Sequence, residues 1–339
     1  MHKFIVVKRL HKTRKDEFVD ATSPQQNPNQ TITDLNLGPS DPYIKNPIHS
    51  DFVYFGCKFG QLVSYCLSKK EVSCIYGKVM KNDVTYASVT NDKKYIFVSD
   101  QKGEMKQIHA ESGKIIVDYG QVAITKDDKY IFTVDDKSGQ YIQWSVESRT
   151  AVKDYGSILT EKAVKSLYIT PDNRYLYCGG LGGCLVQLFI SERAIAKRHN
   201  NLLNGVIYAM CSTKDSKTLI VADWNGHVKS INITKTQHPY TFGKMGDTNT
   251  YCMTITANNK RLFLVSGKWI TFVDLDSRKE IRKISSEYPS DVCSMVCGKD
   301  DELLYVAFEN GYLKELNIKE LKYTTTKLIT DEKITVMTY

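Results

Sequence analysis

Thr170 Pro171 Asp172 Asn173 Arg174 Tyr175 is the stretch that decides the fold, because versions of it recur along the chain. Each copy stands between two short apolar runs, and its Asp or Asn can accept local backbone hydrogen bonds, so each predicts a tight turn between two strands. The copies follow one another at about 40 residues, which is the spacing of propeller blades. The other copies begin at Thr90, Thr125, Thr213 and Thr256, with a looser one at Gly298.

Positions at a fixed distance from the turn Asp or Asn behave alike in every copy. Five residues before it there is always an apolar side chain, and eleven or twelve residues after it there is a glycine, except where Ser266 Gly267 Lys268 shifts that glycine. The glycine marks a second turn and is followed by an alternating strand. The apolar set is Ala87, Val122, Leu167, Met210, Met253 and Met295, and the glycines are Gly103, Gly139, Gly183, Gly226 and Gly311.

The two ends of the chain together supply a seventh blade. Residues 52–56 and 61–65 match the second and third strands of a blade that has no first strand before it. Residues 334–339 match a first strand, with Met337 at the apolar position. We therefore expect the C-terminal strand to pair with the N-terminal blade, which leaves neither half-blade with an exposed edge. An open row of hairpins is the alternative, and it would leave both half-blades unpaired.

With these repeats, residues 51–339 resemble a degenerate seven-bladed WD-repeat β-propeller. In that family a Pro-Asp-Gly-like turn, a strand, an Asp/Asn-x-Gly turn and a strand ending in Trp-Asp recur; here Trp144 keeps the Trp and Ser145 replaces the Asp. The usual Gly-His pair is missing, so the family's His-to-Asp network cannot form in the usual way. The resemblance implies an all-β propeller that acts as a protein-interaction platform. Lactonase-like seven-bladed propellers share the turn pattern and imply instead a hydrolase or a small-ligand binder that uses the central channel.

Composition predicts one intracellular globular body in a reducing compartment. The 339 residues are 42% hydrophobic, which is ordinary for a folded protein. No apolar run approaches the roughly 18 residues that span a bilayer, and residues 4–7 are too few for a secretory signal. The nine cysteines are an odd number without a C-x-x-C pair, which favours free, buried thiols. We expect a cytoplasmic protein, with the cilium or cytoskeleton and the mitochondrion as further possibilities, and no membrane partner.

Residues 1–50 form a separate segment, which we interpret as a basic, largely irregular N-terminal arm. Up to Lys15 it has six basic residues and no acid, and its later part is rich in Pro, Asn, Gln and Ser without apolar periodicity. Three interpretations remain open: a solvated tail, an arm that binds an acidic protein or filament surface, and a mitochondrial presequence. The basic candidates for binding are Lys8, Arg9, Lys12, Arg14 and Lys15.

The net charge of +8 does not by itself indicate nucleic acid. Residues 51–339 keep +6, spread over the turns, and no arginine cluster alternates with aromatics as in base-stacking modules. Because the first turn of every blade lies on one face, the turn lysines should form a ring there, diluted by neighbouring Asp. Such a mixed ring is either a solvated surface or a docking site for acidic proteins. Its first-turn members are Lys93, Lys94, Lys129, Arg174, Lys217, Lys260 and Arg261.

The opposite face is predicted to carry large apolar side chains in exposed loops. Trp224 is the sharpest candidate, since it stands between Asp223 and Asn225 Gly226 in a tight turn. It is either an anchor for a partner protein or a lid over a neighbouring part of the core. The other expected members of this surface are Phe59, Phe308, Tyr288 and Met245.

Catalytic signatures are absent from the sequence. It contains no G-x-S-x-G, no G-x-x-x-x-G-K-[ST] and no H-E-x-x-H. Residues 179–183 are glycine-rich but join two strands, so no helix dipole would hold a phosphate. Asp100, Asp135 and Asp223 recur at strand ends that face the channel, where we expect them to cap turn amides.

Cys293 and Cys297 share a strand face but lack a second pair to complete a metal site. We therefore expect a non-catalytic protein without a metal or cofactor.

Overall fold

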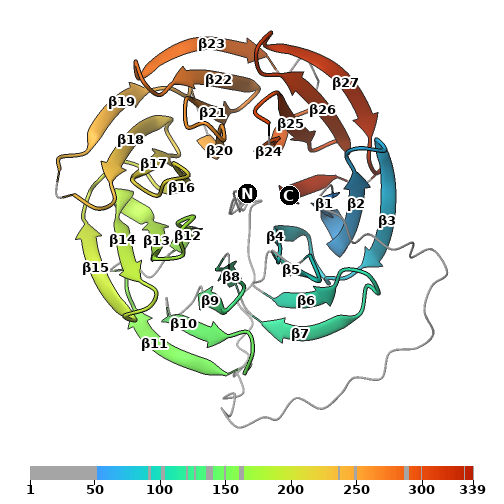
Figure 1. Ribbon diagram of the computed structural model, residues 1–339, viewed down its shortest axis with the longest axis horizontal. Helices are drawn as coiled ribbons and strands as arrows, with labels where there is room; N and C mark the ends of the chain where they lie inside the picture. Colours follow the sequence, from blue (N-terminus) through green and yellow to red (C-terminus); the bar gives the residue numbers. More distant parts are fainter. Residues whose placement is uncertain are drawn as a thin grey trace, which may run out of the picture.

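The computed structural model describes residues 52–90, 93–100, 104–119, 121–125, 127–134, 140–148, 150–159, 164–235, 237–247, 250–285, 290–298, 300–331 and 333–338. In these ranges the chain forms seven antiparallel four-stranded sheets that stand as blades around a central axis (Figure 1). The helical segments among the same residues are two single turns, η1 (Lys58–Gly60) and η2 (Leu181–Gly183). The predicted seven-bladed β-propeller is confirmed.

Six blades use four consecutive strands each, counted outward from the axis. The second and third blades are β4 (Val84–Val89), β5 (Tyr95–Asp100), β6 (Met105–His109), β7 (Ile115–Tyr119) and β8 (Gln121–Ile124), β9 (Tyr130–Val134), β10 (Gln140–Ser145), β11 (Ala151–Ser157). The fourth and fifth are β12 (Val164–Ile169), β13 (Tyr175–Gly180), β14 (Leu185–Phe189), β15 (Ala194–His199) and β16 (Ile207–Ser212), β17 (Thr218–Asp223), β18 (His227–Asn232), β19 (Tyr240–Lys244). The sixth and seventh are β20 (Thr250–Ile255), β21 (Arg261–Ser266), β22 (Trp269–Asp274), β23 (Lys279–Ser285) and β24 (Val292–Cys297), β25 (Leu303–Phe308), β26 (Tyr312–Asn317), β27 (Lys322–Leu328).

The first blade closes the ring with strands from both ends of the chain. Its order is β28 (Ile334–Thr338), β1 (Phe52–Cys57), β2 (Gln61–Cys66) and β3 (Glu71–Lys78), and the C-terminal strand lies beside the blue β1 in Figure 1. Phe55 pairs with Met337 across this junction. A side-chain ion pair between Lys70 and Glu315, 2.9 Å long, joins the first blade to the seventh. The predicted closure is therefore confirmed, and no end strand of the ring lacks a neighbour.

The repeated six-residue stretch is a turn whose side chains hold its own backbone. The Thr170 hydroxyl oxygen accepts the Tyr175 N–H at 3.1 Å, and the Asp172 carboxylate accepts the Arg174 N–H at 3.1 Å and the Thr170 hydroxyl at 2.6 Å. Asn173 has the left-handed φ of 59° that such a tight turn requires. The same bonds recur in the fifth blade at residues 213–218, so the sequence repeat is a repeat of turn chemistry.

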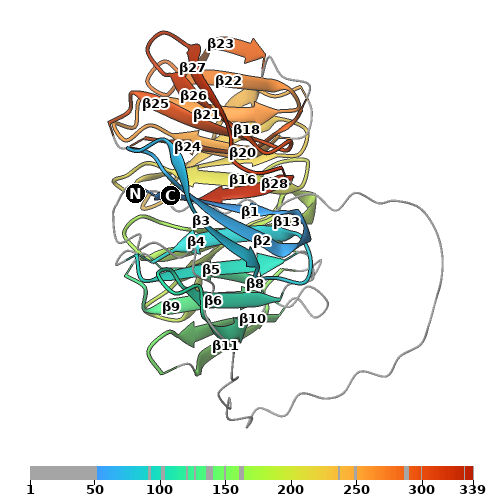
Figure 2. The ribbon, with the colours of Figure 1, turned by 90° about the vertical axis from the view of Figure 1, so that its right-hand side faces the viewer.

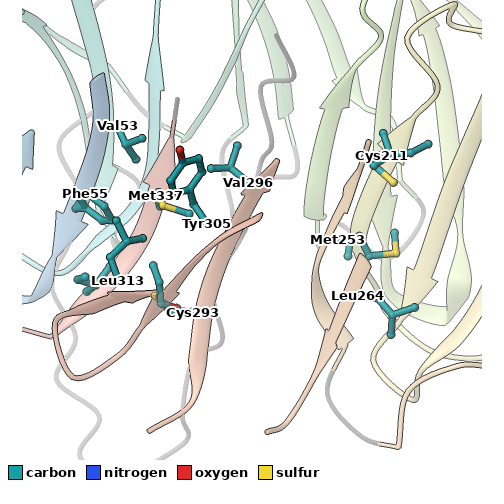
Figure 3. Close-up of a cluster of buried hydrophobic side chains, with 14 of the residues drawn as sticks. Val53, Phe55, Cys211, Met253, Leu264, Cys293, Val296, Tyr305, Leu313 and Met337 are labelled. Carbon is teal, nitrogen blue, oxygen red and sulfur yellow. The ribbon is translucent and has the colours of Figure 1, made fainter. Parts of the chain in front are cut away.

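Figure 2 shows the ring of blades edge-on. The core lies between neighbouring blades. The predicted apolar positions are buried wherever the structure describes their side chains. Figure 3 shows Phe55 of β1, Met337 of β28 and Cys293 of β24 in one cluster, which ties the first blade to the seventh. All nine cysteines are thiols rather than disulfide partners, as the sequence predicted.

Candidate interaction surface

One face of the ring, which we call the connection face, holds the second turn of each blade and the links between blades. The first and third turns lie on the opposite face, because consecutive strands of a blade are antiparallel. The inner strands β4, β12, β16, β20 and β24 begin at the connection face, and each carries a register shift around its second residue. Such β-bulges re-aim a side chain. The residues at this position are Thr85, Lys165, Tyr208, Tyr251 and Cys293.

Trp224 packs on the bulge residue of its own blade. Its ring lies 5.0 Å from the ring of Tyr208, centroid to centroid, at an interplanar angle of 52°. Its backbone N–H donates to the Val206 carbonyl oxygen at 2.9 Å. Both Trp224 and Tyr208 are half-buried, so the pair offers partly exposed aromatic surface on the connection face rather than a core lid that is sealed from water. We call these two rings the aromatic stack.

A buried carboxylate fixes the turn that carries the stack. Asp223 is fully buried, and one of its oxygens accepts the backbone N–H groups of Asn225 and His227, both at 2.9 Å. The other oxygen accepts the Gly205 N–H at 3.1 Å and lies 3.2 Å from Nδ1 of His227. Bonds to a charged acceptor are stronger than neutral ones. Trp224 is thus presented by a backbone that is already fixed.

Close packing of the neighbouring link adds to this rigidity. Gly226 has a left-handed φ of 85°, and a Cβ built there would lie 2.2 Å from the Gly246 carbonyl oxygen, which no side chain allows. The Gly226 oxygen in turn accepts the N–H groups of Met245 and Gly246, at 2.9 and 3.2 Å. The second turn of the fifth blade is therefore locked to the link that leads into the sixth blade.

Phe59 is exposed as predicted, and a tryptophan that sequence reasoning did not select lies on the same face. Phe59 is 59% exposed in the second turn of the first blade, where its N–H donates to Asp83 at 3.0 Å. Trp269 is 42% exposed at the start of β22, beside the second turn of the sixth blade. The shifted glycine at Gly267 is the signal that could have found it, because Trp269 follows that turn directly.

The predicted exposure of two other residues is wrong. Phe308 is fully buried because it is the last residue of β25, paired with Val292, and its side chain points into the cluster between the sixth and seventh blades. Met245 is 8% exposed because the link after β19 folds inward onto the fifth blade. The remaining candidates lie outside the described residues: Tyr288, Lys8, Arg9, Lys12, Arg14 and Lys15.

Asp100 and Asp223, two of the three strand-end aspartates, accept backbone N–H groups of their turns, as predicted. Asp100 accepts the Glu104 N–H at 3.2 Å and the Asn82 side-chain amide at 2.7 Å, and Asp223 accepts the bonds described above. Asp135 lies outside the described residues. Across the part of the chain that the structure describes, His, Cys, Asp and Glu side chains nowhere gather in threes as metal ligands.

Cys293 and Cys297, the conceivable metal pair, make ordinary hydrogen bonds instead. The Cys293 thiol donates to the Ala307 carbonyl oxygen at 3.2 Å, and the Cys297 sulfur accepts the Thr254 hydroxyl at 3.7 Å. Burial raises the pKa of the Cys297 thiol to about 12. A thiol must lose its proton to bind a metal, so the environment of Cys297 opposes that role.

The opposite face carries the mixed charges that the sequence predicted. Lys217 pairs with Asp215 of the same turn at 3.3 Å, and Lys129 pairs with Asp127 at 3.8 Å. Both lysine side chains are largely exposed, so each pair is weak and screened by salt. These pairs dilute the positive ring, and they leave the aromatic stack as the sharper candidate for recognition.

Comparison with known proteins assigns this chain to no family. The chain matches no family model, and no curated protein matches it. Among the described residues, no helix has the length and apolar character that crossing a bilayer requires. The chain is a seven-bladed β-propeller that carries the aromatic stack on its connection face.

Proposed function

We propose that this protein is a non-catalytic platform for protein assembly, and that a partner protein docks on the connection face over the aromatic stack. The stack of Trp224 on Tyr208, held in place by buried Asp223, is the observation that carries the proposal. In the finer form of the proposal the chain is a WD-repeat-like structural subunit of a larger assembly, such as one on ciliary microtubules or one in mitochondria.

The physical reasons favour a protein as the ligand. Large aromatic side chains that are partly exposed and already ordered bury much area on binding at little cost in conformational entropy. Hot spots of protein interfaces are enriched in Trp and Tyr for this reason. Because Asp223 orders the turn before any partner arrives, the partner would meet a rigid surface of the kind that binds with small rearrangement.

The proposal that the protein is not an enzyme is supported by the way Asp100 and Asp223 are used. These are the carboxylates that a catalytic site in the channel would have needed. Both oxygens of Asp100 and of Asp223 accept hydrogen bonds from the protein. A carboxylate used in this way holds turns together and is poorly placed to act as a general base or as a metal ligand. For this reason we favour a platform over a lactonase-like hydrolase or a small-ligand binder.

A second contact is proposed for the basic arm. Lys8, Arg9 and Lys12, with Arg14 and Lys15, would attract an acidic protein or filament surface. Such an attraction between exposed charges weakens when salt rises, because the Debye length is only about 8 Å at physiological ionic strength. The arm would therefore speed the encounter, and the aromatic stack would fix the bound geometry.

Quantitative affinity purification from the source cells tests this function. We compare the wild-type chain with Trp224→Ala and with Tyr240→Ala, a matched control because Tyr240 is 40% exposed on the outer strand β19. We expect Trp224→Ala to deplete one set of co-purifying proteins about tenfold or more, and Tyr240→Ala to retain it. Equal recovery with both variants would count against the connection face, and turnover of an ester or lactone by the purified chain would count against the non-catalytic assignment.

A further inference from the structure

The junction where the ring closes carries a groove on its outer side that is lined by both apolar and polar side chains. A pocket of about 450 Å³ lies between the first and seventh blades. Two large apolar side chains stand at it in contact with water: Ile75 of β3 is 64% exposed and Leu328 of β27 is 47% exposed. The other lining residues are Gln61, Val63, Ile329, Thr330 and Asp331. We call this pocket the closure groove.

The other six blades show that Ile75 is exceptional. Strand register places Ile75 opposite Val63, which is the third residue after the second-turn glycine Gly60. The equivalent residue in each other blade lies opposite the third residue after that blade's glycine, or the fourth after the shifted Gly267. Each of the six equivalents is polar or charged. They are Asp118, Asp154, Arg198, Thr241, Lys283 and Thr326. The apolar side chain at this position is thus confined to the closure groove.

Leu328 departs from the repeat in the same way. It pairs with Tyr312, the first residue of the third strand in its blade. Tyr312 directly follows the second-turn glycine Gly311, and where the equivalent residue of another blade is paired, its partners are Lys78, Ser157, Lys244 and Ser285. Two exposed apolar side chains that depart from the pattern of the other blades therefore lie at one groove, which favours an apolar occupant.

We propose that the groove is the docking site for residues 4–7 of the same chain, Phe4 Ile5 Val6 Val7. These four form the longest apolar run in residues 1–51, all of which lie outside the described residues. The occupant and the groove match in character, because aromatic and β-branched side chains in an extended segment fill pockets alternately along a strand. Lys3 and Lys8 flank the run, and Asp331 is exposed at the groove, where it offers a complementary charge to one of them.

The arm starts close enough to reach this site. Phe52, the first described residue, pairs with Cys66 at one end of β2, and Gln61 at the other end lines the groove. A six-residue strand is about 20 Å long. A flexible linker of 44 residues, the number from 8 to 51, would span roughly 33–40 Å. The tether thus covers the distance and gives the apolar run a millimolar-range effective concentration at the groove.

Photo-cross-linking in the full chain tests the proposal directly. Ile5 is replaced by the photoreactive residue p-benzoylphenylalanine, and the cross-linked peptides are mapped by mass spectrometry. We expect cross-links within one chain to residues 61–63, 75 and 328–331, with a yield that does not change on dilution. Cross-links to other blades would overturn the proposal. So would cross-links between two copies whose yield rises with concentration, since a second copy would then be the occupant, and so would the absence of any cross-link.

Substitutions in the groove supply the control. Ile75→Asp, and separately Leu328→Asp, should lower the cross-link yield about tenfold, because each places a charge in the apolar contact. Ile281→Asp is the matched control, since Ile281 is 48% exposed on the outer strand β23 of another blade, and it should leave the yield unchanged. An unchanged melting temperature shows that each variant is folded, as expected for exposed positions. A yield that Ile75→Asp and Leu328→Asp both leave intact would overturn the assignment of the groove.

Discussion

Asn259 of the sixth blade accepts the backbone N–H of Lys214 in the fifth blade, with 2.8 Å between the amide oxygen and the nitrogen. Ser216 does the same for Asp172 one blade earlier, at 3.2 Å, and Asp301 does so for Asn258 one blade later, at 2.8 Å. All three acceptors occupy the left-handed position of the repeated turn. The stretch that folds each hairpin therefore also joins neighbouring blades.

Removal of one of these links should weaken the ring measurably. The Asp301 carboxylate accepts the N–H groups of both Ala257 and Asn258, so Asp301→Ala leaves two amides without that partner. Hydrogen bonds to a charged group are worth about 1.5–3 kcal/mol, and we expect a loss in the free energy of unfolding of that size. Denaturant unfolding followed by circular dichroism measures it.

Two further variants distinguish the contribution of the hydrogen bonds between blades from the contribution of the bonds within a turn. Asp301→Asn keeps the left-handed preference and one accepting oxygen, so it should cost less than Asp301→Ala. Asp127→Ala removes an exposed carboxylate that accepts the Lys129 N–H of its own turn and pairs with the Lys129 ammonium, and it should cost less than about 1 kcal/mol. If Asp301→Ala cost no more than Asp127→Ala, the link between blades would contribute nothing.

The closing strand should be indispensable. Val336 of β28 is fully buried and pairs with Gly56, so Val336→Asp places a charge in the junction between the blades. We expect the loss to exceed about 4 kcal/mol, which is diagnostic of a disrupted core, and a chain that stops before residue 334 should not unfold cooperatively. Leu328→Asp, at an exposed site nearby, is the control for charge alone. A melting temperature that Val336→Asp leaves unchanged would contradict the pairing.

Stability should fall in alkali because tyrosines are buried. Burial raises the pKa of Tyr54 to about 12 in the folded chain, against about 10 in an unfolded one. Between these values the unfolded chain releases a proton that the folded chain keeps, so the free energy of unfolding decreases as pH rises. The contribution is fully present below pH 10 and is lost between about pH 10 and 12, by about 2 kcal/mol or more. Unfolding titrations at several pH values check this, and Tyr54→Phe should reduce the slope.

The aromatic stack should matter little for stability. A pair of aromatic rings in contact is worth about 0.5–1.5 kcal/mol, so Trp224→Ala should destabilise the protein by about that amount. Phe308→Ala, which truncates a fully buried ring, should cost about 3–5 kcal/mol. Chemical unfolding of both variants makes the comparison. A loss at Trp224 as large as that at Phe308 would make Trp224 a core lid.

Much of the fold could be predicted because its information is local. The Thr, the Asp and the left-handed residue of each turn bond within six residues, so the turn can be read from a short window. Ring closure was also predictable, since the strand that the N-terminal blade lacks is supplied at the other end with Met337 in register. Phe59 was found because it stands inside a turn rather than beside one.

The rest depends on direction and distance, which a linear pattern does not give. Phe308 stands directly before its turn in the sequence. Because it is the last residue of β25, its side chain points into the core. Tyr208 and Trp224 are 16 positions apart in sequence, and their contact exists only because a β-bulge and a second turn meet on one face. The closure groove joins β3 to β27, so Ile75 and Leu328 could be recognised as neighbours only in the closed ring.

Footprinting of the aromatic stack in the native assembly tests the central claim most directly. The protein is oxidatively labelled once in isolation and once within the complex purified from source cells, and the labelling of Trp224 is compared with that of Tyr240 on the outer rim. If the connection face binds the partner, Trp224 becomes protected by about tenfold or more, while Tyr240 keeps its label. Equal labelling of Trp224 in both states would contradict the proposed function.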